Sequence, residues 1–124
     1  MNLVRMIQSF KDAASGVAYV FWNEQNFRLQ VFASLVVILF SWYFRLSRSE
    51  WVVILLLIFL VIILELINSA VEKFADVLKP RLDLQVQTVK DIMAGVVLLA
   101  SLGAILIGLV IFYPHLVEFI GRWW

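Results

Sequence analysis

The feature that most constrains the fold is a run from residue 51 to residue 64 in which every side chain is apolar. As an α-helix this run extends about 21 Å, and polar residues then continue the same helical pattern. A bilayer has a hydrocarbon core of about 30 Å, where only helices and closed barrels satisfy their backbone groups. The sequence therefore predicts a membrane-spanning helix at residues 51–72. Because 64% of the 124 residues are hydrophobic, a single integral membrane domain at residues 1–124 is expected.

Four polar residues form a stripe at the end of this apolar run. Glu65, Asn68, Glu72 and Asp76 fall within about 80° of one another around a helix. An ionisable group inside a membrane span costs roughly 2.5–3.5 kcal/mol, so the stripe indicates a cation, a polar ligand or a polar partner. The alternative is that Glu72 and Asp76 lie beyond the membrane at an ordinary charged helix end.

The remaining chain predicts two further spans and an amphipathic helix. Residues 1–22 place apolar side chains at alternating steps of four and three, which suits a helix in the membrane interface or one packed on the protein's own spans. The other predicted spans are residues 27–44 and 92–113, with residues 45–50 as an exposed loop and Pro114 ending the last helix. Ala100, Ala104 and Gly108 are spaced for close helix contact. The expected fold class is therefore an all-α membrane protein.

The basic residues predict the orientation of the chain. Seven of the ten Lys and Arg residues belong to the amino-terminal region and the second connection, whereas Arg45, Arg48 and Arg122 lie on the other side. By the positive-inside rule, the amino terminus and the acidic stripe are expected in the cytoplasm and the carboxyl terminus outside.

Several polar groups are expected to converge on the cytoplasmic side. Carboxylates suit Mg²⁺, which often binds through one or two carboxylates plus substrate phosphates, and lysine suits a phosphate as a compact charge. Such a set favours phosphoryl transfer from a nucleotide to a lipid hydroxyl, although the Gly-rich P-loop is absent. Thiol chemistry is excluded because the chain has no Cys, and the lone histidine cannot form a histidine-rich metal site. The converging residues are Glu24, Arg28, Glu65, Asn68, Glu72, Asp76, Lys90 and Asp91.

These residues carry a resemblance to a known family. The pattern Glu65-x-x-Asn68-Ser69-Ala-x-Glu72-x-x-x-Asp76, followed by Lys90-Asp91 and preceded by Asn23-Glu24-x-x-Phe27-Arg28, resembles the prokaryotic diacylglycerol kinases, which include the undecaprenol kinases. The resemblance covers nearly the whole chain. It implies an interfacial helix plus three membrane helices, assembled as a homotrimer in the bacterial cytoplasmic membrane with active sites shared between subunits. The junction at Asp91 and the ending at Pro114 look somewhat more like the undecaprenol branch.

The resemblance also implies a role for each matched residue. Glu65 would be the general base and would contact the lipid substrate with Ser69 and Arg28, while Asn68 would orient the reacting groups. Glu24 and Glu72 would hold Mg²⁺ and, through it, ATP. Arg5, Lys90 and Asp91 would contact the nucleotide. The expected partners are thus ATP, a lipid alcohol, the bilayer and further copies of the chain, with no nucleic acid.

A second hypothesis from the same residues is non-catalytic. A small oligomeric channel or transporter could coordinate a cation with the acidic stripe. Transfer of the γ-phosphate of ATP to a lipid distinguishes the enzyme from the channel.

Overall fold

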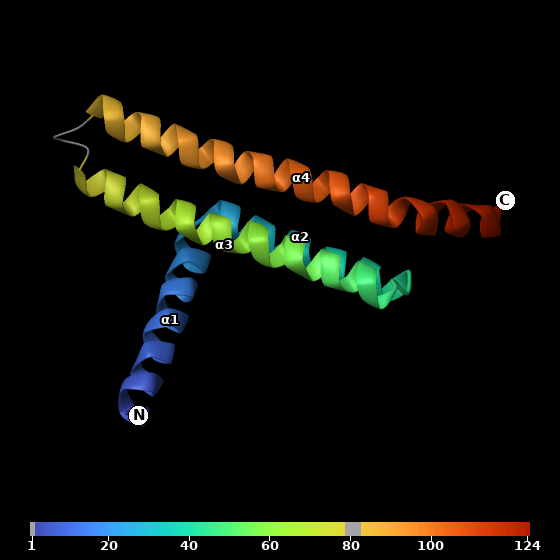
Figure 1. Cartoon of the computed structure of the whole chain (residues 1–124), viewed down its shortest axis with the longest axis horizontal. Coiled ribbons are helices and arrows are strands. Elements are labelled where there is room, and N and C mark those ends of the chain that lie inside the picture. Colours follow the sequence, from blue (N-terminus) through green and yellow to red (C-terminus); the bar gives the residue numbers. More distant parts are fainter. Residues whose placement is uncertain (1, 79–82) are drawn as a thin grey trace.

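The protein, described by a computed structural model over residues 2–78 and 83–124, consists of four helices (Figure 1). These are α1 (Leu3–Asn23), α2 (Gln25–Tyr43), α3 (Arg48–Leu78) and α4 (Asp83–Trp123). Three helices are long and apolar enough to cross a membrane: Gln25–Tyr43, Arg48–Leu78 and Leu84–Trp123. The predicted all-α class, with one amino-terminal helix and three candidate spans, is confirmed.

Helix α1 projects away from the bundle formed by the other helices (Figure 1). It begins at Asn2, whose side-chain oxygen accepts hydrogen bonds from the backbone N–H groups of Val4 and Arg5, as a good N-cap does. The apolar side of α1 is uncovered within the chain, with Phe10 73% exposed. The end of α1 packs on the bundle, where the Phe21 ring meets Phe27 edge-on at 6.4 Å. This exposed apolar side matches the amphipathic pattern of the sequence.

The turn between α2 and α3 is tighter than the exposed loop predicted for residues 45–50. The N–H of Leu46 donates to the carbonyl of Ser41, and that of Arg45 to the carbonyl of Trp42, which together form a Schellman motif. Leu46, which follows the left-handed residue of the motif, is buried. Helix α3 then starts at once, because Ser47 and Glu50 exchange backbone and side-chain hydrogen bonds in a capping box.

Helices α3 and α4 lie antiparallel and form the main packing contact of the chain (Figure 1). The buried side of α3 repeats at helical spacing, with Ile54, Val61, Glu65 and Ser69 on it. The packing is not tight everywhere. A Cβ added to Gly108 would meet nothing within 4 Å among the described residues, so the predicted close contact is not made there within one chain.

The prediction that Pro114 ends the last helix is wrong, because α4 continues through it to Trp123. Proline removes one backbone hydrogen bond, but aromatic packing holds the helix on both sides of it. The Phe44 ring lies 6.1 Å from Phe112, before the proline, and 5.9 Å from Phe119, after it. His115 adds an interhelical contact, since its Nε2 lies 3.0 Å from a carboxylate oxygen of Glu50 on α3.

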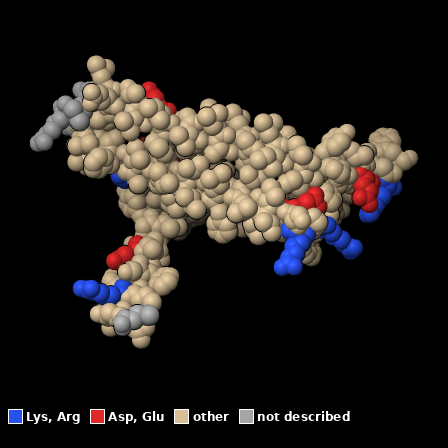
Figure 2. Space-filling view, in the orientation of Figure 1, with Lys and Arg blue, Asp and Glu red and all other residues tan. Residues whose placement is uncertain are grey.

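The helices extend beyond the predicted spans at most ends. Helix α3 runs to Leu78, so Asp76 is helical, and α4 begins at Asp83, before the predicted start at residue 92. The second connection is therefore shorter than expected, and its basic residues Lys79 and Arg81 lie outside the described residues. Charged groups gather towards the two ends of the bundle and on α1, whereas the middle of the visible face is uncharged (Figure 2). This distribution is the one a bilayer requires.

Candidate active site

Glu65 is the centre of the candidate site and lies buried in the bundle. The side of α3 that packs inward carries it together with Ser69, and their residues are 3% and 4% exposed. Buried carboxylates are rare unless a partner or ligand compensates for their lost hydration. The carboxylates of Glu72 and Glu24 are near enough for their charges to act on Glu65. Acids from two parts of the chain therefore lie at this end of the bundle, where α1 contacts α3.

Asn68, one turn after Glu65, contributes a polar atom without a partner. Its side-chain N–H donates to Glu72 Oε1 over a long 3.5 Å, while its Oδ1 is buried and accepts no hydrogen bond from the described residues. A buried acceptor left without a donor or cation costs about 1–3 kcal/mol. The sequence predicted Asn68 as a site residue, and the structure leaves its oxygen available for a ligand.

Glu24 reaches the site from the junction between α1 and α2. It is the single residue between these helices and is extended, with φ −116° and ψ 112°. Its N–H donates to Val20 and its carbonyl accepts from Arg28, so the backbone is satisfied. The carboxylate makes no capping hydrogen bond to α2 and is free for another role. The junction thus brings an acid near α3 that is 41 residues distant from Glu65 in the chain.

Lys90 brings α4 to the same end of the bundle. Its ammonium lies 3.1 Å from Asp76 Oδ1 on α3, and the two side chains are 26% and 61% exposed. Such a partly exposed pair contributes little to stability, so the lysine can exchange this partner for a phosphate at small cost. Asp91, next to it, is exposed and accepts a hydrogen bond from Gln87 at 2.9 Å.

The other predicted site residues have different surroundings within one chain. Arg28 donates to the carbonyls of Phe21 and Trp22, at 2.8 and 3.0 Å, and thereby caps the end of α1. Arg5 is exposed in the first turns of α1, the part that projects from the bundle (Figure 1). The described chain does not bring Arg5 together with the acids.

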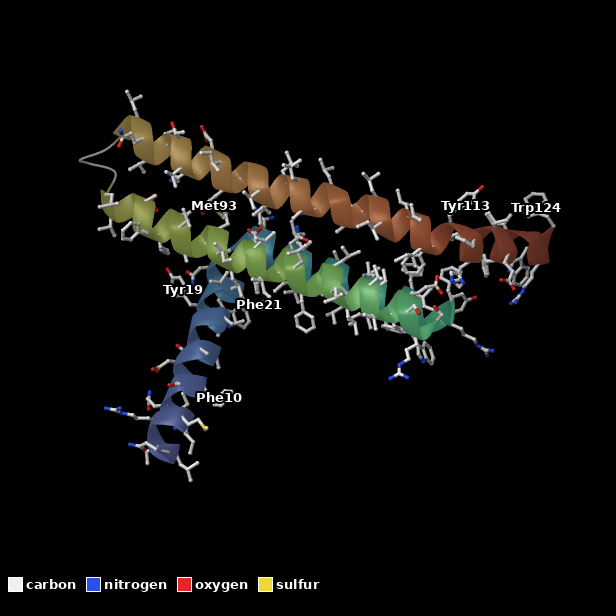
Figure 3. The ribbon with its side chains drawn as sticks, in the orientation of Figure 1. Phe10, Tyr19, Phe21, Met93, Tyr113 and Trp124 are labelled. Carbon is white, nitrogen blue, oxygen red and sulfur yellow. The ribbon has the colours of Figure 1, made fainter. Side chains whose placement is uncertain are left out.

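One contact near the site was missed by sequence reasoning. The ammonium of Lys73 lies 5.0 Å from the centre of the Tyr19 ring and so joins α1 to α3. Figure 3 shows Tyr19 at the end of α1, where this helix meets α3. Lys73 directly follows Glu72, a residue of the acidic stripe. Only the packing of α1 on α3 shows that the lysine contacts Tyr19. The pair holds α1 against the helix that carries Glu65.

The donor atoms fit a hard divalent cation without forming a complete cage. No group of three metal-ligating His, Cys, Asp or Glu side chains occurs within residues 2–78 and 83–124. Two carboxylates and an amide oxygen, from Glu24, Glu72 and Asn68, are nevertheless the ligand types that Mg²⁺ prefers. Mg²⁺ commonly completes its shell with water and substrate phosphates.

The fold and site define a class of protein: a small helical membrane protein with an acidic, lysine-flanked site at one end of its bundle. The chain belongs to the prokaryotic diacylglycerol kinase family, whose model matches residues 11–112. It is therefore an enzyme, a kinase of the membrane lipid kinase type, and the predicted resemblance is confirmed.

Named relatives agree with this membership. The chain is 33% identical to an undecaprenol kinase of Bacillus subtilis (strain 168) over 115 residues, or 93% of this chain and 94% of that protein. It is also 33% identical to a diacylglycerol kinase of Synechocystis over 114 residues, covering 65% of that longer protein. A diacylglycerol kinase of Haemophilus influenzae is 32% identical over 75 residues.

Proposed function

We propose that the protein transfers the γ-phosphate of ATP to the hydroxyl of a membrane lipid, either diacylglycerol or undecaprenol, at the cytoplasmic membrane face. The observation that carries this proposal is the buried Glu65 beside the unpaired amide oxygen of Asn68, in a chain of this kinase family. A lone cation-binding role explains the acids, but it does not explain Lys90 or the family membership.

In the proposed reaction, Glu65 accepts the proton of the lipid hydroxyl as the hydroxyl oxygen attacks the γ-phosphorus. The bond from this phosphorus to the bridging oxygen breaks, and ADP leaves. Burial suits Glu65 to this role because water is kept from the reacting atoms. Ser69, one turn further on the same buried side of α3, would contact the lipid hydroxyl.

The nucleotide is proposed to bind at the outer part of the same end. Lys90 and Asp91 would contact it from α4, and Arg5 from the α1 helix of another copy. Glu24 and Glu72 would hold Mg²⁺, which when bound neutralises charge on the transferring phosphate. Asn68 would orient the reacting groups with its free oxygen. Arg28 would act mainly by fixing α1, with lipid contact as a further role.

The depth of Glu65 supports a meeting of the two substrates. It lies about 26 Å along α3 from Arg48, where the helix starts, so in a core of about 30 Å it sits near one interface. A lipid hydroxyl arrives laterally at this depth, and ATP approaches from water. We place this end in the cytoplasm by the positive-inside rule. Labelling of a Ser47→Cys variant only from the cytoplasm would contradict this orientation.

We also propose a homotrimer. Its support is the family resemblance and the small core of a single chain, in which the spanning part of α4 has no buried residue. Native mass measurement of the detergent-solubilised protein would give three chains. A monomer with full kinase activity would refute shared active sites.

The test of the function is a kinase assay on purified protein with a matched pair of variants. Glu65→Gln keeps size and removes the base, so turnover should fall by at least about 100-fold while assembly is unchanged. Glu50→Gln removes a carboxylate from the other end of the same helix and keeps the capping box, which Gln also supports. It should retain turnover. Near-normal activity of Glu65→Gln would exclude the proposed base.

The lipid is identified by competition. Diacylglycerol and undecaprenol are offered together at equal mole fraction in mixed micelles, and the labelled products are separated. We expect one product to dominate in wild type and neither to form with Glu65→Gln. Ion flux through vesicles without any phosphate transfer would instead support the cation channel.

A further inference from the structure

A cavity of about 620 Å³ lies at the end of the bundle opposite the acidic site, between the end of α2 and the last turns of α4. Its wall is aromatic. The Phe119 ring lies 5.9 Å from Phe44 and 6.1 Å from Tyr43, and the Trp123 ring lies beyond it at 6.2 Å, tilted by 59°. A cavity of this size accommodates a small organic group. Tyrosine and tryptophan are also the residues that lie at headgroup depth in membranes.

The rim of this cavity carries arginines. Arg122 donates to Glu118 at 3.0 Å, an exposed pair within one helix. Arg45 also lines the cavity, and no ion pair involves it within the part of the chain that the structure describes. Figure 2 shows several basic side chains at this end of the molecule, apart from those on and near α1. The rim has a net positive charge because it carries two arginines, Arg45 and Arg122, and one acid, Glu118.

The backbone at Arg45 gives an independent reason to assign its side chain a role. Arg45 has a positive φ of 54°. No other residue within 2–78 and 83–124 has a positive φ. It occupies the left-handed position of the Schellman motif, where glycine is usual because other residues pay about 1–2 kcal/mol. The protein would therefore be more stable with glycine than with arginine at position 45. The side chain at the cavity rim is the evident compensation.

We propose that this cavity binds the phosphate of an anionic phospholipid from the leaflet opposite the acidic site. The guanidinium groups of Arg45 and Arg122 would hold the phosphate, and the glycerol and upper acyl chain would lie on the aromatic wall. The basic rim and the aromatic wall together match a lipid better than a free anion, since a free phosphate uses only the rim. This inference does not depend on the kinase activity.

The test measures which lipid the protein retains. Purified protein in detergent is equilibrated with equal amounts of phosphatidylglycerol and phosphatidylcholine with the same acyl chains, and bound lipid is counted by native mass spectrometry. Wild type should prefer phosphatidylglycerol. Arg45→Gly should lower this preference by about fivefold, and Arg45→Gly with Arg122→Gln by about 30-fold. The control Arg48→Gln removes a nearby arginine that does not line the cavity and should keep the preference.

A second measurement separates loss of binding from misfolding. Arg45→Gly relieves the left-handed strain, so its thermal midpoint in phosphatidylcholine should equal or exceed that of wild type, while the gain from added phosphatidylglycerol disappears. An unchanged preference in the double variant would overturn the proposal, as would an equal loss in Arg48→Gln. Displacement of the lipid by inorganic phosphate would identify a free-anion site instead. Loss of the oligomer without a change in preference would identify a contact between copies.

Discussion

Replacing Asn68 with leucine should stabilise the protein while abolishing its activity. The side-chain oxygen of Asn68 is buried without a donor among the described residues, and leucine has nearly the same size. Removing an unpaired buried acceptor recovers about 1–3 kcal/mol. The 3.5 Å hydrogen bond to Glu72, one turn further on the same helix, is lost, at a cost of about 0.5 kcal/mol for a pair at this spacing. The net expected gain is about 1–2 kcal/mol.

The gain is measured by thermal unfolding in detergent, followed by the fluorescence of the five tryptophans. For a chain of this size, about 1–2 kcal/mol corresponds to a rise of about 4–8 °C in Tm. In the kinase assay the same variant should lose about 100-fold or more in kcat, the usual effect of removing a group that positions reacting atoms.

A matched control uses a polar residue that does have a partner. Gln30 on α2 donates to the Ser101 hydroxyl on α4 at 3.4 Å. Gln30→Leu should leave Tm unchanged or slightly lower and should keep activity. If Asn68→Leu lowered Tm, the oxygen must have a partner in the assembled protein. If it retained activity, Asn68 would have no part in orienting the substrates.

Four further substitutions test the ion pair of α3 and α4, the capping of α1 and the proline of α4. Asp76→Asn should change stability by less than about 1 kcal/mol because the ion pair with Lys90 is partly exposed. Lys90→Gln should leave Tm similar but raise KM for ATP. An unchanged KM for ATP would refute a nucleotide role for Lys90. Arg28→Gln should speed hydrogen exchange at residues 17–23 and lower the free energy of unfolding by about 1.5 kcal/mol, because the charged hydrogen bonds to two carbonyls of α1 are lost. Unchanged exchange would refute the capping role of Arg28. Pro114→Ala restores one backbone hydrogen bond and should raise stability by about 1 kcal/mol; a lower Tm would show that the proline geometry is needed for the aromatic packing.

The class of fold was predictable because a bilayer leaves few solutions for so apolar a chain. A run without a polar side chain at residues 51–64 can only be buried in lipid or protein, and helical periodicity then fixes the acidic stripe. Glu65 and Ser69 do lie on the buried side of α3, whereas Asp76 is exposed. Angular position on one helix is a local property, so the sequence carries it directly.

Contacts between elements were less predictable. Pro114 was expected to end a helix, and only the rings of Phe44 and Phe119 show why the helix persists. The predicted lipid contact of Arg28 rested on a motif, while its observed partners are carbonyls of another helix, Phe21 and Trp22. No local pattern reports such partners, because they depend on how α1 turns into α2.

The one-residue junction at Glu24 restricts how this chain can vary. An added residue there would rotate α1 by about 100° relative to α2 and would carry the carboxylate away from Glu65. A deletion would fuse α1 and α2 into one continuous rod and remove the bend that lets the first helix leave the bundle. The one-residue spacing between α1 and α2 should therefore be as restricted as the choice of glutamate at position 24. Insertions and deletions in this family should be confined to other connections.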